Sequence, residues 1–237
     1  MCGICGCSEA VHENTSHHHK SDKLINIEEN LFSENNKIAI QNSEYFKKNK
    51  ILALNIMSSP GAGKTTLLTK TISNLNKENR FSVIVGDQQT DLDAEMIKTS
   101  GATVLQINTG RTCHLDAHMI SHAIEDLSIK DQSILFIENV GNLVCPSLFN
   151  LGEHLRIVML SVTEGDNKPL KYADIFHCAD LMILSKLDLL PFVDFDVKKC
   201  IEYAKQINPK IEVLQLSTKS GDGLSSWYEW LQHKTLK

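Results

Sequence analysis

The sequence predicts an α/β fold in which a mostly parallel sheet is covered by helices on both faces. Two observations predict it: short apolar runs alternate with amphipathic stretches from residue 50 onward, and a glycine-rich loop joins the first apolar run to the next amphipathic stretch. Such alternation favours a parallel sheet, because each helix carries the chain back across it. The expected strands are 51–57, 81–86, 103–107, 133–137, 157–162, 181–185 and 211–216, and the expected helices are 64–77, 93–100, 116–127, 168–176, 197–207 and 224–233.

The 237 residues divide into three parts. Residues 1–22 have no apolar periodicity, so we expect a flexible tail whose cysteines and histidines bind metal. Residues 23–49 have apolar positions at helical spacing and form a helical lead-in, of one helix or of two, since polar residues interrupt the pattern at 33–36. Residues 50–237 contain the alternating pattern and form the α/β domain.

The composition excludes several classes of protein. With 42% hydrophobic and 22% charged residues the chain is globular, and its net charge of −5 argues against binding to nucleic acid through positive charge. No apolar run is long enough to cross a membrane and no secretory pattern is present, so we expect a cytoplasmic protein without a membrane partner. In that reducing compartment, an odd count of seven cysteines indicates metal ligands or redox groups rather than a disulfide framework.

The most informative segment is a phosphate-binding loop, Ser-Ser-Pro-Gly-Ala-Gly-Lys-Thr-Thr, over residues 58–66. It lies between an expected strand and an expected helix, which is the context that such a loop requires; the alternative is an ordinary glycine-rich turn. Lys64 would reach the β- and γ-phosphates of a nucleotide and Thr65 would bind Mg²⁺, whereas Ser58 replaces the usual first glycine. The expected nucleotide contacts are Ser59, Pro60, Gly61, Ala62, Gly63, Lys64, Thr65 and Thr66.

Two later strand ends predict that the nucleotide base is guanine. Residues 185–188 are Ser-Lys-Leu-Asp, in which Asp188 would accept hydrogen bonds from guanine and Lys186 would pack along the base. Ser185 replaces the Asn of the usual motif, with some loss of affinity expected. Residues 217–219 resemble a loop that contacts guanine through its backbone N–H groups. The expected base contacts are Lys186, Asp188, Ser217, Thr218 and Lys219.

Carboxylates at two further strand ends predict a Mg²⁺ site beside the phosphates. Asp87 ends one expected strand and is followed by Asp91 and Asp93, and Glu138 ends another. The expected Mg²⁺ residues are Thr65, Asp87, Asp93 and Glu138, and the expected catalytic residues are Lys64, Thr65 and Glu138. Because no residue stands out as a general base for the attacking water, we expect slow hydrolysis.

Cys113, His114 and Cys145 follow strands at the same sheet edge and could bind Zn²⁺, Ni²⁺ or copper. Water or a second copy of the chain could complete the ligand shell. The alternative is that both cysteines are small buried residues and that His114 begins a helix. His118 and His122 would lie on one helix face with His114, either extending this site or facing solvent.

The tail predicts a second metal site. Cys2, Cys5 and Cys7 offer three thiolates within six residues, which suits Ni²⁺ or Zn²⁺ better than an iron–sulfur cluster with its usual four cysteines. The histidines at 17–19 could add weaker capture sites, and the alternative is a disordered tail with incidental cysteines.

Taken together, these motifs resemble those of the HypB family, GTPase accessory proteins for nickel insertion into [NiFe]-hydrogenase. The resemblance extends over the whole chain. Its motifs are Met-Cys-x-x-Cys-Gly-Cys at 1–7, the loop at 58–66, Gly-x-x-Cys-His-Leu-Asp-Ala at 110–117, Glu-Asn-Val-Gly-Asn-Leu-Val-Cys-Pro at 138–146 and Lys-Pro-Leu-Lys-Tyr at 168–172.

The resemblance implies a SIMIBI-type P-loop GTPase domain over 50–237 that binds GTP and GDP with Mg²⁺ and forms a homodimer across its nucleotides. It implies a high-affinity nickel site at Cys2, Cys5 and Cys7, and a weaker Ni²⁺ or Zn²⁺ site at Cys113, His114 and Cys145. The implied partners are a HypA-type maturation protein, a SlyD-type nickel chaperone and the assembly complex of the hydrogenase large subunit. The expected function is nickel delivery coupled to GTP hydrolysis.

Three other functions fit parts of the sequence. A urease-type nickel GTPase of the UreG family has Cys-Pro-His where this chain has Cys113 directly followed by His114. A metal-storage or metal-sensing protein could retain a vestigial nucleotide site. An ATP-using transferase or kinase would prefer ATP despite Asp188.

Overall fold

The computed structural model describes residues 16–75, 80–88 and 91–235, with side chains within the first helix described from residue 30 onward. Cys2, Cys5 and Cys7 therefore lie outside the described residues, as do the side chains of the histidines at 17–19. Residues Asn35–Lys237 form one compact unit, and the part of the chain before them forms another. Among the described residues, no helix is long and apolar enough to span a bilayer.

Seven parallel strands form one sheet in the order β3-β2-β4-β1-β5-β6-β7. All seven strands expected from the sequence are present, with ends that differ by no more than two residues. They are β1 Leu52–Ser58, β2 Phe81–Asp87, β3 Thr103–Asn108, β4 Ile134–Glu138, β5 Leu155–Ser161, β6 Leu181–Ser185 and β7 Glu212–Gln215. The predicted parallel sheet is confirmed, and β1 lies at its centre between β4 and β5.

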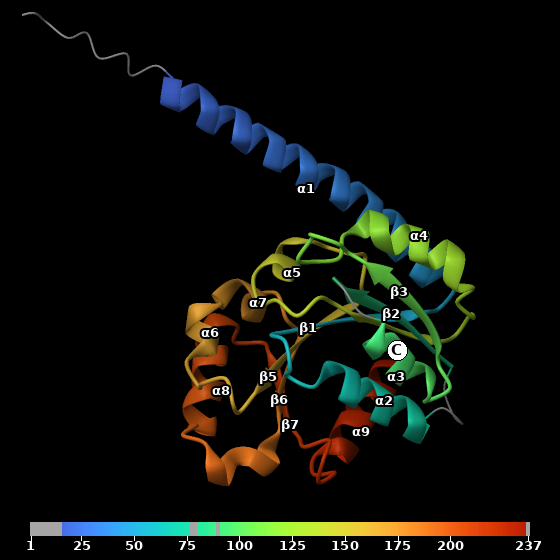
Figure 1. Ribbon diagram of the computed structural model, residues 1–237, viewed down its shortest axis with the longest axis vertical. Coiled ribbons are helices and arrows are strands. Elements are labelled where there is room, and N and C mark those ends of the chain that lie inside the picture. Colours follow the sequence, from blue (N-terminus) through green and yellow to red (C-terminus); the bar gives the residue numbers. More distant parts are fainter. Residues whose placement is uncertain (1–15, 76–79, 89–90, 236–237) are drawn as a thin grey trace, which may run out of the picture. The chain divides into compact units, whose positions relative to one another are not determined.

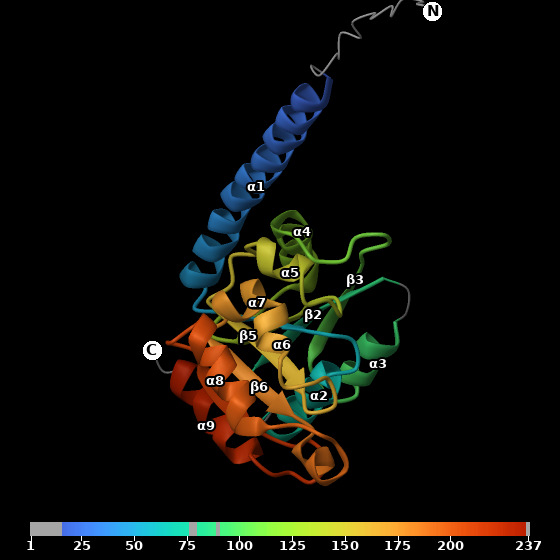
Figure 2. The same ribbon diagram turned by 90° about the vertical axis from the view of Figure 1, so that its left-hand side faces the viewer.

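Helices cover both faces of this sheet, as predicted (Figure 1). On one face the apolar core is shared with α2 (Lys64–Leu75), α3 (Leu92–Lys98) and α9 (Leu224–Thr235). On the other face it is shared with α4 (Ala117–Leu127), α7 (Ala173–His177) and α8 (Val197–Ile207). The helix α6 (Lys168–Lys171) lies beside α7 and α8 (Figure 2).

Three helical segments differ from the prediction. The helix expected over 168–176 is interrupted at Tyr172, whose φ of −124° and ψ of 51° are not helical, so α6 and α7 are separate. A short helix, α5 (Cys145–Leu148), and a 3₁₀ helix, η1 (Leu187–Phe192), were not predicted, because each is too short to produce an apolar period.

The lead-in is a single helix, α1 (Ser16–Lys48), and it begins before the expected residue. The polar residues at 33–36 do not break it. Asn35 donates through Nδ2 to the oxygen of Asn150 and accepts through Oδ1 from the N–H of Ala117. Its side chain is thus bonded to the domain and does not compete with the helical backbone.

Candidate nucleotide and metal site

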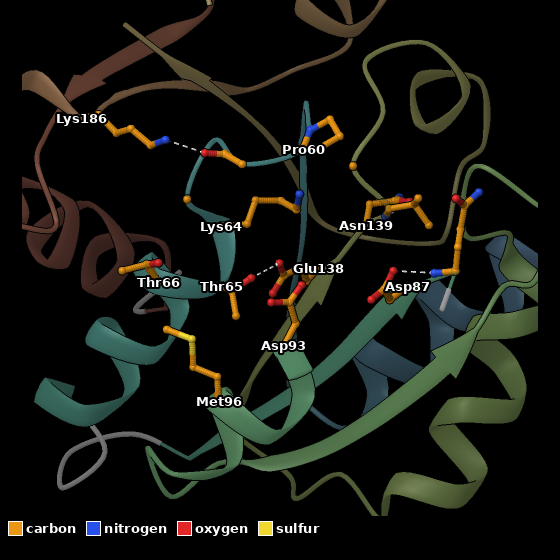
Figure 3. A pocket seen from close by; sticks show the side chains of 16 residues that line it. Pro60, Lys64, Thr65, Thr66, Asp87, Asp93, Met96, Glu138, Asn139 and Lys186 are labelled. Carbon is orange, nitrogen blue, oxygen red and sulfur yellow. Dashed lines mark hydrogen bonds between the residues drawn. The ribbon is translucent and has the colours of Figure 1, made fainter. Parts of the chain in front are cut away.

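A cavity of about 470 Å³ opens at the carboxyl ends of the central strands, where parallel sheets commonly bind ligands (Figure 3). Its walls come from the phosphate loop, the start of α2, the ends of β2 and β4, and α3. The lining residues are Pro60, Gly61, Gly63, Lys64, Thr65, Thr66, Gly86, Asp87, Gln88, Asp93, Met96, Glu138, Asn139, Val140, Gly141 and Lys186.

The backbone of the phosphate loop has two conformations that glycine adopts more readily than other residues do. Gly61 and Gly63 have φ angles of 74° and 100°, in the left-handed region that favours glycine. Ser58, which replaces the usual first glycine, is the last residue of β1. Its hydroxyl accepts a hydrogen bond of 2.9 Å from the Nζ of Lys64. The serine therefore holds the lysine at the start of α2, a role that the sequence did not reveal.

Lys64 and Glu138 are buried charged groups beside the cavity, with 8% and 3% of their surface exposed. Burial lowers the pKa of Lys64, and the nearby carboxylates oppose this effect. Burial raises the pKa of Glu138 to about 7, although the charge of Lys64 lowers it. Burial thus disfavours the charged form of each group, and the attraction between the two opposite charges offsets part of that effect.

The structure brings the four expected Mg²⁺ residues to one wall of the cavity. The hydroxyl of Thr65 donates to Oε1 of Glu138 across 2.7 Å, and Asp87 and Asp93 lie nearby (Figure 3). Oε2 of Glu138 is buried and has no hydrogen-bond partner among the described residues. An unpaired buried carboxylate oxygen next to a hydroxyl fits a hard cation such as Mg²⁺. Asp91 does not line the cavity.

The expected guanine residues lie together, but most of them are outside the cavity wall. The Nζ of Lys186, at the wall, donates to the oxygen of Gly61 across 2.6 Å. Oδ1 of Asp188 accepts a hydrogen bond of 2.5 Å from the hydroxyl of Ser217. That hydroxyl also accepts from the N–H groups of Lys219 and Ser220, so it joins the two strand-end loops. Thr218 contributes its main-chain oxygen to a contact with the Nζ of Lys70.

Sequence reasoning missed several residues of the site. The cavity is also lined by Gln88, Met96, Asn139, Val140 and Gly141. The sequence signal that could have identified them was their position, directly after strand ends or on α3. Ser59 was expected to contact nucleotide. It is absent from the cavity wall and donates its hydroxyl to the Glu164 carboxylate, whose other oxygen accepts from the N–H of Ser161.

Asn139 links the cavity to the neighbouring loop. Oδ1 of this buried side chain accepts from the N–H of Leu115 at 3.1 Å and from that of Val140 at 2.9 Å. Its Nδ2 donates to Oδ1 of Asn55 in the central strand, at 3.2 Å. The side chain therefore joins β1, the segment after β4 and the segment that precedes α4.

Cys113, His114 and Cys145 come together although 31 positions separate the two cysteines. Their possible ligand atoms all lie within 4.8 Å of one another, and all three residues are partly exposed. The His114 ring stacks on Phe149 with centroids 3.8 Å apart and planes at 14°. Burial lowers the pKa of His114, and a hydrogen bond with Cys113 raises that of Cys145. This is the one such cluster of three or more among the described residues, and soft ligands suit Ni²⁺ or Zn²⁺.

Comparison with known proteins identifies the family. The model of the CobW/HypB/UreG nucleotide-binding domain matches residues 52–215. The chain is 51% identical over 212 residues to the hydrogenase maturation factor HypB of Azotobacter chroococcum mcd 1, covering 90% of this chain and 70% of that relative. The chain belongs to the HypB family.

Solved structures of HypB proteins share its fold. The crystal structure of the hydrogenase maturation factor HypB from Archaeoglobus fulgidus has a TM-score of 0.81 and 40% identity, covering 86% of this chain and 99% of that one. The crystal structure of HypB from Helicobacter pylori in complex with nickel has a TM-score of 0.79 and 40% identity, covering 85% and 95%. These likenesses confirm the predicted family and its SIMIBI-type P-loop fold.

In this HypB-family chain, His118 and His122 do not extend the cluster of Cys113, His114 and Cys145. His114 precedes α4, which begins at Ala117, so the three histidines do not share one helix face as expected. His118 and His122 alone lie on α4, and both are exposed.

Proposed function

We propose that the protein is a GTP-hydrolysing nickel carrier that serves the maturation of a [NiFe]-hydrogenase, with metal binding coupled to nucleotide-dependent dimerisation. Its relatives are named hydrogenase maturation factors, and the similar structure from Helicobacter pylori is a complex with nickel. The observation that carries the proposal is one short segment. It begins at Glu138 in the cavity wall and ends at Cys145 in the metal cluster.

In this proposal the phosphate loop holds the nucleotide. The N–H groups of residues 61–66 surround the phosphates, and the N-terminus of α2 faces their negative charge. Lys64 neutralises the β- and γ-phosphates, and the desolvation of its ammonium strengthens that attraction. Asp188 selects guanine, with Ser217, Thr218 and Lys219 beside it and Lys186 along the base.

The Mg²⁺ ion would be held by Thr65 and Glu138, with Asp87 and Asp93 binding it or its waters. When bound, the ion neutralises charge that develops on the phosphates. Glu138 must lose its proton to take this role, since a neutral carboxyl is a poor ligand for a hard cation. Lys64, Thr65 and Glu138 thus act as the catalytic residues by binding and orientation. None of them supplies a general base, so turnover without a partner is slow.

The coupling between nucleotide and nickel follows from contacts of the segment 138–145. Thr65 bonds to its first residue, and a Cβ at Gly141 would lie 3.0 Å from Cγ of Pro60, so the segment packs against the phosphate loop. Asn139 also holds Leu115, the residue after His114. A shift of this segment on hydrolysis therefore moves both sides of the metal cluster.

Nickel is the cargo in this scheme. The tail cysteines Cys2, Cys5 and Cys7 form a tight site, and Cys113, His114 and Cys145 form a weaker one that binds Ni²⁺ or Zn²⁺ and responds to nucleotide. The proposed partners are a second copy of the chain, a HypA-type maturation protein, a SlyD-type chaperone and the large-subunit assembly complex.

The experiment is a nickel titration of the reduced protein in the presence of GDP or of a non-hydrolysable GTP analogue. We expect the nickel affinity of the weaker site and the oligomeric state to differ between the two nucleotides. A triple variant, Cys2→Ala with Cys5→Ala and Cys7→Ala, isolates the weaker site. The matched control is Cys178→Ala, a half-buried free cysteine outside the cluster. Equal affinity and equal oligomeric state with both nucleotides would overturn the coupling.

Turnover assays separate the alternatives. GTP hydrolysis that is lost in Lys64→Ala excludes a storage protein with a vestigial nucleotide site. A preference for ATP over GTP, unchanged in Asp188→Ala, would support the transferase or kinase instead.

A further inference from the structure

A buried ion pair lies next to the end of α5, the short helix whose first residue is Cys145 of the metal cluster. Nε of Arg156 donates to Oε1 of Glu153 across 2.7 Å, and only 18% and 2% of the two side chains are exposed. Opposite charges attract each other more strongly here than at the surface, because little water screens them. The pair therefore holds the guanidinium in one orientation.

The other donors of Arg156 reach the main chain at the end of α5. Nη1 donates to the oxygen of Ser147 at 3.3 Å, and Nη2 donates to that of Phe149 at 3.4 Å. Ser147 lies within α5 and Phe149 is its C-cap residue, so neither oxygen has a partner inside so short a helix. One guanidinium thus bonds to a carboxylate and to two carbonyl oxygens at once.

Helix α5 depends on such contacts for its position. It spans four residues, Cys145–Leu148, and a single turn is not stable on its own. Its N-cap residue, Val144, makes no side-chain hydrogen bond to the helix, whereas Arg156 provides two hydrogen bonds at the other end. Phe149 in turn stacks on His114. Arg156 therefore influences two metal ligands, Cys145 through α5 and His114 through the phenyl ring.

Glu153 connects the same ion pair to the start of the segment 138–145. Its Oε1 also accepts from Nδ2 of Asn55 at 3.2 Å, and Oδ1 of Asn55 accepts from Asn139. Its Oε2 accepts from the N–H of Leu151 at 2.7 Å. The ion pair is thus bonded to the beginning of the segment through Asn55 and to α5 at its end.

We propose that Glu153 and Arg156 are positioning residues of the metal cluster, which hold Cys145 and His114 at the separation that one Ni²⁺ or Zn²⁺ ion requires. Neither residue is a ligand of the cluster or part of the cavity wall, so both act through α5 and through Phe149. The inference rests on the metal site and the nickel function proposed above.

The test is Arg156→Lys, which keeps the positive charge but has one nitrogen in place of three. A lysine can retain the ion pair with Glu153, but it cannot also hold the Ser147 and Phe149 oxygens. The reduced full chain with the triple tail substitution is titrated with Ni²⁺ without nucleotide, and thiolate-to-nickel absorption reports binding. We expect the dissociation constant for Ni²⁺ to rise by about tenfold, the lower end of the range for residues that orient metal ligands. The affinity for GDP should not change.

Arg80→Lys is the matched control, because Arg80 is exposed and forms no ion pair with the described residues. It should leave the Ni²⁺ affinity unchanged. Arg156→Lys should cost less affinity in a Phe149→Ala background than in the parent protein, because both substitutions release the same ring. Glu153→Gln is the second variant should Arg156→Lys fail to fold, and it should also weaken Ni²⁺ binding, since a neutral side chain holds Arg156 less firmly.

Unchanged Ni²⁺ affinity in both Arg156→Lys and Glu153→Gln would overturn the positioning role. Equal losses of Ni²⁺ and GDP affinity would overturn it too, because they indicate a general loss of structure. If the variants bind Ni²⁺ more weakly while the parent protein binds it equally with GDP and with the GTP analogue, the positioning role stands and the proposed coupling fails. A parent protein whose cluster binds no Ni²⁺ would overturn both proposals.

Discussion

The hydroxyl of Ser185 donates a hydrogen bond of 2.8 Å to the main-chain oxygen of Ala62, across 123 positions of sequence. Ser185 ends β6 and is the first residue of the expected guanine motif, and Ala62 is in the phosphate loop. Both residues are buried. The serine that replaces the usual asparagine therefore still ties the segment 185–188 to the phosphate loop.

We predict that Ser185→Ala weakens both folding and nucleotide binding, because the buried Ala62 oxygen loses this donor. The free energy of unfolding should fall by about 1–3 kcal/mol in urea titrations of the nucleotide-free protein. The matched control is Ser133→Ala, because the Ser133 hydroxyl is buried and has no partner among the described residues. That substitution should leave stability unchanged or raise it. Equal losses in the two variants would contradict the role assigned to Ser185.

The second prediction concerns pH. Burial raises the pKa of Glu138 from 4.5 to about 7 in the folded protein. Between these values the folded state holds the proton more tightly than the unfolded state. The free energy of unfolding should therefore fall as pH rises from 4.5 to 7 and then level off, as far as this group is concerned.

Thermal or urea unfolding at a series of pH values measures this dependence. Glu138→Gln should flatten it, whereas Glu125→Gln, at an exposed position of α4, should not. The affinity for Mg²⁺ with GDP should instead rise as pH increases through 7, because the ion requires the carboxylate. A Mg²⁺ affinity that is independent of pH in the parent protein would argue against Glu138 as a ligand.

The third prediction concerns the ring beneath His114. Phe149 stacks on His114 with centroids 3.8 Å apart and so fixes the imidazole plane. Phe149→Ala should lower the affinity of the Cys113 cluster for Ni²⁺ by about two- to tenfold, the range expected for an aromatic pair. Titration in the triple tail variant measures it. Phe149→Leu keeps the apolar bulk without the ring. If stacking sets the affinity, this variant should also bind Ni²⁺ more weakly than the parent protein.

The fourth prediction concerns the packing of residues 138–145 against the phosphate loop. A Cβ at Gly141 would lie 3.0 Å from Cγ and 3.1 Å from Cα of Pro60. Gly141→Ala should therefore push the segment away and lower the affinities for both GTP and Ni²⁺. Leu148→Ala, at an exposed residue of α5, provides the control. A variant that lost GTP binding with unchanged Ni²⁺ binding would contradict the coupling through this segment.

The strands could be predicted from sequence because each is a short apolar run with a polar or glycine boundary. The phosphate loop was equally clear, since its residue types are set by backbone geometry at Gly61 and Gly63. The convergence of Cys113, His114 and Cys145 was also predictable, because both of their loops follow strands at the same sheet edge.

The rest depends on neighbours in space. The bond between Asn139 and Asn55 requires β1 and β4 to be adjacent, a pairing that periodicity does not specify. The continuity of α1 depends on partners that Asn35 finds more than 80 positions away. The distance of 3.1 Å between the Nε2 atoms of His118 and His122 likewise depends on their rotamers, whereas the sequence established only that both lie on one helix face.

The central place of β1 has a consequence for synthesis on the ribosome. This strand is made early, yet its neighbours are β4 and β5, which end at Glu138 and Ser161. In a nascent chain that stops short of Ser161, β1 does not yet have its full neighbour β5. The phosphate loop that follows β1 therefore lacks support on that side. The cavity beside the phosphate loop can therefore be completed only after β5 has been made, and until then the apolar strands made first lack a neighbour to cover them.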